Sequence, residues 1–325
     1  MLAKGLLVGI GCMLALGVVG DLIEPGEATV GLENSIFRSE EARDRLMEIY
    51  DERLAEWPVA FEEIDVETSY GTVHVIASGP AGGDPVLLLH ASELSATSWG
   101  PNIGAFTGFR TYAIDHIGEV NKSRLADVDV YPKTRSDIAE LYAEIADRLE
   151  VERSIVVGAS NGGFVAMSYA IEFPERVSKL VLPGPMGLTP PPLQMGLRLL
   201  AAQFIHWRWV ERGALEWILG TSPIVLDPYG EWFTWVMRGS FPRVVPPCGI
   251  PTEELATIQV PVLLFLGTRD NLVGAPERAA AAAAAMEDLD AIVIESAHLV
   301  NVEAADEVNR RIVEFLTESN GQEGA

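Results

Sequence analysis

The feature that most constrains the fold is a set of six short apolar segments, each five to eight residues long. Their Val, Ile and Leu residues are consecutive and do not alternate with polar ones, which is typical of strands buried on both faces of a sheet. Segments with helical periodicity separate them, so the sequence predicts an α/β fold with a mostly parallel central sheet flanked by helices. The predicted strands are residues 85–90, 111–115, 154–158, 179–183, 260–267 and 291–295. The predicted helices are residues 136–149, 162–172, 275–286 and 302–318.

One long segment interrupts this alternation of strands and helices. Residues 186–257 contain no convincing core strand, but they hold three consecutive prolines and five of the seven tryptophans in amphipathic stretches. An insertion of this size after a core strand is predicted to form a helical cap over the sheet. The α/β core is then assembled from residues 62–185 and 258–325.

An extension with its own helix precedes the core. Within residues 21–61, apolar residues recur at helical spacing from 39 to 57, and Ser39 is placed to cap the N-terminus of that helix. Alternating apolar residues follow at 63–68 and 72–78, on either side of a turn that contains a glycine. This pattern predicts a β-hairpin that leads into the sheet.

The first 20 residues form a separate hydrophobic N-terminal segment. Residues 5–20 are uncharged and follow a single positive charge, Lys4. As a helix this run would span about 24 Å, short of a bilayer core of about 30 Å, so it fits the apolar region of a signal peptide better than a full span. We expect export or membrane anchoring through this segment. The alternative is a cytoplasmic protein with an amphiphilic extension or a misassigned start.

The charge of the chain excludes one class of partner. Asp and Glu number 47 against 23 Lys and Arg, which leaves a net charge of −24. A chain this acidic is repelled by phosphate backbones, so nucleic-acid binding is not expected. Only four of the basic residues are lysines, a balance that would also suit a high-salt environment. The two cysteines, Cys12 and Cys248, can build neither a disulfide framework nor a Cys-based metal site.

The motif with the most chemical content is Gly158-Ala159-Ser160-Asn161-Gly162. It matches G-x-S-x-G, and it lies where a predicted buried strand ends and a predicted helix begins, which is the context that gives this pattern meaning. Small residues permit a strained turn that exposes the hydroxyl of Ser160. We therefore expect Ser160 to be a nucleophile; a tight turn without chemistry is the alternative.

A serine nucleophile needs a general base and an acid that orients the base. Of the five histidines, His298 alone lies in a loop between the last predicted strand and the C-terminal helix. Asp270 follows the strand at 260–267 and falls between nucleophile and base in chain order, as this architecture requires. We predict that His298 is the base and Asp270 the acid, although Asp270 would also suit a helix cap or surface turn.

Two backbone amides are candidates for an oxyanion hole. The amide of Asn161 follows the nucleophile at a helix N-terminus, where N–H groups face outward. The second should come from the loop after the strand that ends at His90, and we expect it to be the amide of Ser92. The hydroxyl of Ser92 could form a hydrogen bond within the site; the alternative is that it only stabilises the loop.

With these residues in place, the chain resembles the α/β-hydrolase superfamily from about residue 64 to residue 316, and the serine, the acid and the histidine follow in the expected order. The segment 112–123 (YAIDHIGEVNKS) is similar to a carboxylesterase-like bacterial subgroup, and 50–59 (YDERLAEWPV) resembles the N-terminal helix of that subgroup. The resemblance implies a serine hydrolase with a helical cap that needs no metal and no cofactor.

The chain departs from the family pattern at one position of the oxyanion loop. The family usually has His-Gly there, whereas Ala91 follows His90 in this chain. If that position needs a positive φ, alanine costs about 1 kcal/mol or more and shifts the hole.

Several aromatic residues, together with this loop, are candidates for the walls of an apolar substrate pocket; packing of the cap onto the core is the alternative. The expected pocket residues are His90, Ala91, Trp99, Trp207, Trp232 and Trp235.

The resemblance implies hydrolysis of a small to medium carboxylic ester through an acyl-enzyme formed on Ser160. The same constellation serves C–C bond hydrolases, lactonases, perhydrolases and acyltransferases, so the fold does not select the bond. A ligand sensor that retains the three residues without turnover is a further alternative. The expected partner is a small-molecule ester, and the sequence does not specify an oligomeric state.

Overall fold

The computed structural model describes residues 35–205 and 207–318. The hydrophobic segment at residues 1–20 therefore lies outside the described residues, as do Cys12 and most of the stretch before Ser39. Within the described chain, no helix combines the length and apolar character needed to cross a bilayer.

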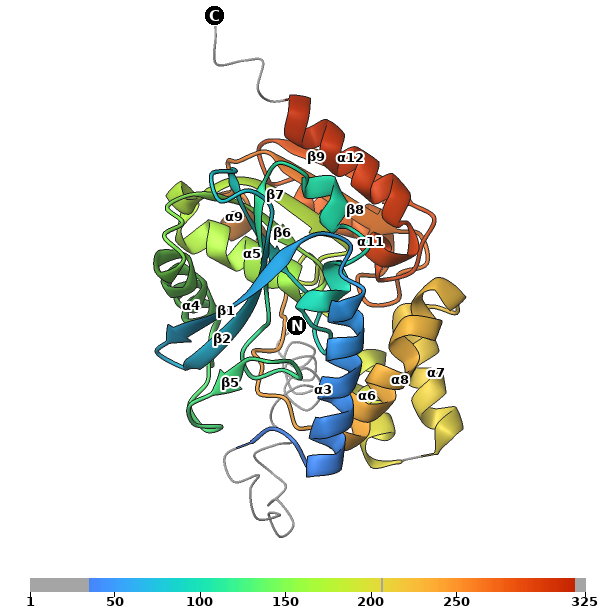
Figure 1. Ribbon diagram of the computed structural model, residues 1–325. Helices are drawn as coiled ribbons and strands as arrows, with labels where there is room; N and C mark the ends of the chain where they lie inside the picture. Colours follow the sequence, from blue (N-terminus) through green and yellow to red (C-terminus); the bar gives the residue numbers. More distant parts are fainter. Residues whose placement is uncertain (1–34, 206, 319–325) are drawn as a thin grey trace, which may run out of the picture.

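A nine-stranded, mostly parallel sheet forms the centre of the molecule (Figure 1). The strand order is β1-β2-β4-β3-β6-β7-β8-β9, and the short β5 pairs with β2. Strands β1, β2 and β4 pair antiparallel, whereas all neighbours from β4 to β9 are parallel. The strands are β1 (Phe61–Thr68), β2 (Gly71–Ser78), β3 (Pro85–Leu89), β4 (Arg110–Ile114), β5 (Arg124–Leu125), β6 (Ser154–Gly158), β7 (Val177–Pro183), β8 (Val262–Gly267) and β9 (Leu289–Ile294). All six predicted core strands and the hairpin are confirmed, and β5 is an addition.

Helices cover both faces of the sheet, which explains the continuous apolar runs. In β3, Leu87 and Leu89 pack into one hydrophobic cluster with helices α4 (Arg135–Arg148) and α5 (Asn161–Glu172). The alternate residues Val86 and Leu88 pack into a second cluster on the other face, with α3 (Glu40–Ala55) and α12 (Ala305–Glu318). Because successive side chains of a strand point to opposite faces, both sets must be apolar.

The remaining helices either belong to the insertion between β7 and β8 or flank the second half of the sheet. Figure 1 shows α6, α7 and α8 grouped beside α3, away from α4 and α5. The remaining helices are α6 (Leu193–Phe204), α7 (Arg208–Leu219), α8 (Pro223–Gly239), α9 (Thr252–Leu255), α10 (Pro276–Ala283) and α11 (Val300–Glu303). Short 3₁₀ turns lie at Ala96–Trp99, Ile103–Phe106 and Pro174–Arg176.

Two predicted helices have different bounds in the structure. The helix expected at 275–286 ends at Ala283, where a tight turn lets the buried Met286 pack into the core before β9. The helix expected at 302–318 is broken at Ala304 into α11 and α12. Helix α11 is attached to the loop before it, because the carboxylate of Glu303 accepts a hydrogen bond from the amide of Ala297 at 2.5 Å.

Helix α3 is capped and buried as its sequence predicts. The Ser39 hydroxyl accepts a hydrogen bond from the amide of Ala42, and Leu46, Tyr50 and Leu54 are buried. The same helix contacts α8: the guanidinium of Arg53 donates to the carbonyl of Pro228 at 2.5 Å. The N-terminal extension therefore connects the core with the inserted helices.

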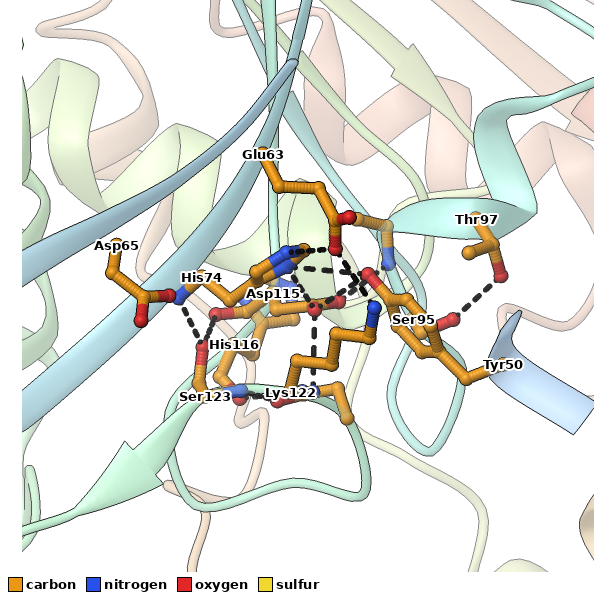
Figure 2. A network of polar contacts seen from close by, with 12 residues as sticks. Tyr50, Glu63, Asp65, His74, Ser95, Thr97, Asp115, His116, Lys122 and Ser123 are labelled. Atoms are coloured by element: carbon orange, nitrogen blue, oxygen red, sulfur yellow. Dashed lines mark hydrogen bonds and ion pairs between the residues drawn. The ribbon is translucent and has the colours of Figure 1, made fainter. Parts of the chain in front are cut away.

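A polar network that extends from buried Asp115 to the surface fixes α3 to the sheet (Figure 2). The hydroxyl of Tyr50 donates to Asp115 Oδ2 at 2.9 Å, and His74 Nδ1 lies 3.0 Å from the same oxygen. On its other side, His74 Nε2 lies 2.9 Å from Glu63 Oε2, which also pairs with the ammonium of Lys122. Burial alone would lower the pKa of His74, but the hydrogen bonds and charges of Asp115 and Glu63 outweigh it and raise that pKa.

This network predicts a pH-dependent contribution of His74 to stability. A histidine with a raised folded pKa stabilises fully below its unfolded pKa of about 6.5, and the contribution is lost as pH rises through the folded pKa. We expect the difference in unfolding free energy between wild type and His74→Gln to shrink from pH 6 to pH 9, measured by urea denaturation. Tyr50→Phe removes the hydroxyl that donates to Asp115 and lies 3.3 Å from His74 Nδ1, but it leaves the imidazole between its two carboxylates, so it should lower stability with a much smaller slope. A pH-independent difference for His74→Gln would contradict the assignment.

Candidate active site

The turn between β6 and α5 holds Ser160 in a strained backbone conformation. Its φ is 52° and its ψ is −116°, a combination that side-chain-bearing residues rarely adopt. Neighbouring segments hold it there: the amide of Ser160 donates to the carbonyl of Pro183 at 3.2 Å, and its carbonyl accepts from the amide of Met186 at 2.9 Å. The end of β7 and the loop after it therefore fix the turn.

Two glycines make this turn sterically feasible. A Cβ on Gly158 would lie 2.2 Å from the carbonyl oxygen of Gly162, and a Cβ on Gly162 would lie 2.1 Å from the carbonyl oxygen of Leu89. Both contacts are with backbone, which cannot move aside as a side chain can. The glycines of the motif are thus required by the close approach of β3, β6 and α5.

The three residues predicted from chain order form one hydrogen-bonded series. His298 Nε2 lies 2.6 Å from Ser160 Oγ, and His298 Nδ1 lies 2.8 Å from Asp270 Oδ2. All three side chains are buried. Ser160 comes from the end of β6, Asp270 from the turn after β8 and His298 from the loop after β9, so the parallel strands bring them to the same edge of the sheet.

The environment of Asp270 favours its ionised form. Burial acts to raise the pKa of Asp270, but His298 and two backbone amides outweigh it and lower that pKa. The amides of Leu272 and Val273 donate to Oδ1 at 2.8 Å and 3.0 Å, which leaves Oδ2 to face the imidazole. A carboxylate fixed in this way selects the tautomer with the proton on Nδ1 and leaves Nε2 free to accept a proton from Ser160.

A cavity of about 130 Å³ lies beside this series, and both predicted oxyanion residues, Ser92 and Asn161, line it together with Ser160 and His298. Among the residues that the structure describes, neither the amide of Ser92 nor that of Asn161 has a hydrogen-bond acceptor. Unpaired N–H groups on two residues that line the same cavity as Ser160 are candidates for binding a developing oxyanion.

The oxyanion loop does not have the strain expected at Ala91. Ala91 is not among the residues with positive φ, and the residue that adopts it is Glu93, with a φ of 59°. The condition under which alanine would cost energy at this position is therefore not met, because the left-handed residue lies two positions further along. The imidazole of His90 holds the start of the loop, since Nδ1 lies 2.8 Å from the carbonyl of Ala91 and Nε2 accepts from the amide of His116.

Glu119 is a site-supporting residue that the sequence reasoning missed. Its carboxyl group accepts a hydrogen bond from the amide of Glu93 at 2.6 Å and from the hydroxyl of Ser92 at 3.3 Å. Burial raises the pKa of Glu93 to about 8, and burial together with the neighbouring Glu93 raises the pKa of Glu119. Both pKa shifts favour the protonated form of the carboxyl group. The only sequence signal for Glu119 was its place in the segment 112–123.

Most of the residues predicted to line the substrate pocket do not line the cavity. Of the six candidates, only Ala91 lines the cavity. Trp99 and Trp232 are fully buried in the second hydrophobic cluster, and Trp235 packs against that cluster. Trp207 is 62% exposed, and His90 is buried beneath the loop.

The cavity walls come mainly from aliphatic and sulfur-containing side chains of the inserted helices. Helix periodicity places an apolar stripe without saying which neighbour it faces, so the sequence could not identify these residues. The lining residues from residue 186 to residue 272 are Met186, Met195, Leu199, Ile218, Leu219, Phe233, Val236, Met237, Ser240, Phe241, Pro242, Pro247 and Leu272.

Metal coordination finds no support in this region. Within residues 35–205 and 207–318, no three or more His, Cys, Asp or Glu side chains are grouped so that they could hold a metal ion. Cys248 is exposed and is not disulfide-bonded.

Comparison with known proteins agrees with the fold. Residues 86–311 match the model of the alpha/beta hydrolase family. The carboxylesterase YbfK and an uncharacterized carboxylesterase, nap, both from Bacillus subtilis (strain 168), are each 31% identical to the chain. These matches cover 86% and 85% of the chain and 96% and 94% of the two relatives. The crystal structure of naproxen esterase (carboxylesterase NP) from Bacillus subtilis superposes with a TM-score of 0.78 at 29% identity, over 86% of this chain and 99% of that one. The protein belongs to the α/β-hydrolase family.

The close approach at the Ser160 turn predicts a specific stability defect. We expect Gly162→Ala to lower the free energy of unfolding by about 1–3 kcal/mol, because its Cβ would overlap the backbone of β3. Gly213→Ala is the matched control, since Gly213 lies in α7 with no atom within 4 Å of an added Cβ, and alanine favours a helix. Urea denaturation of both variants measures the difference. Equal stability of Gly162→Ala and wild type would refute the packing described.

Proposed function

We propose that the protein hydrolyses carboxylic esters, with Ser160 as nucleophile, His298 as general base and Asp270 as the orienting acid. The observation that carries the proposal is the 2.6 Å contact between Ser160 Oγ and His298 Nε2, next to a cavity that Ser92 and Asn161 also line. The carboxylesterase relatives, which match over most of the chain, support an ester as the substrate.

In the first step, Ser160 Oγ attacks the ester carbonyl while His298 Nε2 takes the hydroxyl proton. The amides of Ser92 and Asn161 donate to the oxyanion of the tetrahedral intermediate, and Asp270 stabilises the imidazolium. His298 then gives the proton to the departing alkoxide oxygen, which leaves as the alcohol, and the acyl group remains on Ser160.

In the second step, a water molecule takes the place of the alcohol. His298 removes a proton from the water as its oxygen attacks the acyl-enzyme, and the same two amides stabilise the second oxyanion. When the bond to Ser160 Oγ breaks, the imidazolium returns the proton to that oxygen and the carboxylic acid leaves.

The size and walls of the cavity favour a small apolar substrate. Its volume of about 130 Å³ is below the roughly 300–1,000 Å³ of pockets for drug-sized ligands. Met195 and Leu199 of α6 and Phe233 of α8 contribute apolar walls to it. A short acyl or alcohol group fits these walls better than a charged one.

We also propose that residues 1–20 direct the protein to export or to a membrane, on the strength of the uncharged run at residues 5–20. Fractionation of the native host, with mass determination of the N-terminus, tests this. A wholly soluble and unprocessed product would contradict it.

The proposed roles predict large losses of turnover on p-nitrophenyl esters of graded acyl length. Ser160→Ala should abolish measurable acyl-enzyme turnover, and Asp270→Asn should lower kcat by about 10³–10⁴-fold because the imidazole takes the wrong tautomer. Asp290→Asn, on exposed β9 surface, is the matched control and should retain full activity. Unchanged activity of Asp270→Asn would assign the acid to another residue.

The contacts of Glu119 predict a defect in the oxyanion loop. Glu119→Ala should lower kcat by about 10–100-fold with a small change in KM, since the Ser92 amide loses its support. Glu119→Gln should retain activity within a few fold, because an amide can still accept from the Glu93 N–H. Comparable rates for Glu119→Ala and wild type would show that the loop holds its position unaided.

A further inference from the structure

The connection between α6 and α7 exposes an unusual concentration of apolar surface. Ile205, Trp207 and Trp209 are 41%, 62% and 71% exposed. The centroids of the two indole rings lie 5.7 Å apart, so the rings pack against each other. The other five tryptophans are buried or half-buried, so the two exposed ones lie at a single turn of the described chain.

Helix α6 continues this apolar surface. Its residues Met195 and Leu199 line the cavity, while Leu193 and Leu197, one helical turn apart, are each more than half exposed. A helix with apolar side chains both on its cavity-facing face and on its opposite face is expected to contact apolar groups on both faces. The cavity accounts for the inner face, and no described segment covers these two leucines.

The charge of this region differs from that of the whole protein. Residues 176–210 contain no Asp or Glu over 35 positions, the longest such stretch in a chain with 47 acidic residues. In the same stretch Arg198 and Arg208 are exposed. The carboxylates of α7, Glu211 and Glu216, are paired with Arg238 and Arg212. A surface that combines tryptophan, leucine and arginine is typical of protein faces that lie at the headgroup level of a bilayer.

The fold brings the N-terminal part of the chain to the same inserted helices. The amide of Arg38 donates to the carbonyl of Gly239 at the end of α8, and Phe37 forms a bridge with Ser240. Helix α8 in turn contacts α6 and α7. The chain that contains the uncharged run at residues 5–20 therefore enters the described structure beside the helices that carry the exposed tryptophans.

We propose that the α6–α7 hairpin is a membrane-docking surface, with Trp207 and Trp209 inserted at the interface of a phospholipid bilayer. Arg198 and Arg208 would face lipid phosphates, and Leu193 and Leu197 would lie on the acyl region. Because α6 also lines the cavity, docking places the cavity close to the surface where apolar esters accumulate. This surface does not depend on the chemistry proposed for Ser160.

The test uses the full chain and phosphatidylcholine vesicles with dibrominated acyl chains, which quench indole fluorescence on contact. We expect vesicles to quench and blue-shift the tryptophan emission of the wild type. Trp207→Phe/Trp209→Phe should lose most of the quenching, because the five remaining tryptophans are buried or half-buried, including Trp217, which packs against Arg198. Trp207→Ser/Trp209→Ser should bind vesicles about tenfold more weakly in flotation assays, a loss of about 1.4 kcal/mol. Phe61→Ser/Val130→Ser, which removes exposed apolar residues of the core, is the matched control and should bind as the wild type does.

Three outcomes would overturn the proposal. The first is flotation without quenching, which would show that residues 1–34 bind lipid and the hairpin does not. The second is the absence of flotation. The third is equal quenching by iodide of the wild type and of Trp207→Phe/Trp209→Phe without vesicles, which would show that protein covers the two indoles; sedimentation velocity then separates a second copy from the chain's own N-terminus. Hydrolysis of a soluble ester should be equal in all variants, so a failure of docking is distinct from a failure of the proposed chemistry.

Discussion

The strained turn at Ser160 is the constraint on which the site depends. A φ of 52° in a residue with a side chain costs about 1–3 kcal/mol, and it persists because surrounding segments determine it. Strand β7 binds the amide of Ser160, while β3 approaches so closely that only glycine fits at position 162. Burial of the parallel strands on both faces provides the stability that offsets this strain. Placing the serine hydroxyl next to the helix N-terminus is thus a consequence of the packing of the whole sheet.

A second set of contacts joins the inserted helices to the oxyanion loop. The indole of Trp232 in α8 donates to the carbonyl of Glu93 at 2.6 Å, and the guanidinium of Arg53 lies over the ring of the same tryptophan. On the core side, Glu119 binds the amide of Glu93. The left-handed residue of the loop is therefore held from both sides, by the cap and by the core. Direct contacts therefore link helix α3, the cap and the oxyanion loop.

The sequence predicted the strands and the series Ser160, His298 and Asp270 because these depend on local information. Continuous apolar runs report burial on two faces, and the carboxyl ends of parallel strands must meet at one edge. The same reasoning failed for the pocket. Trp99, Trp232 and Trp235 are as apolar as true lining residues, but their positions within helices and turns do not reveal which neighbour they face. Glu119 was missed because a single acidic residue has no periodicity, and its importance lies in partners 26 and 27 positions away.

The amino-acid sequence alone is enough to predict the sheet, the order of Ser160, Asp270 and His298, and the presence of an insertion. Each of these follows from spacing along the chain, through the two-residue period of strands, the 3.6-residue period of helices and the glycines of one turn. The folded structure is needed to show which residues form the cavity, which loop residue adopts a positive φ and where tryptophans remain exposed. These depend on contacts between segments distant in sequence, whose geometry is set by the packing of complete elements and not by the character of any one residue.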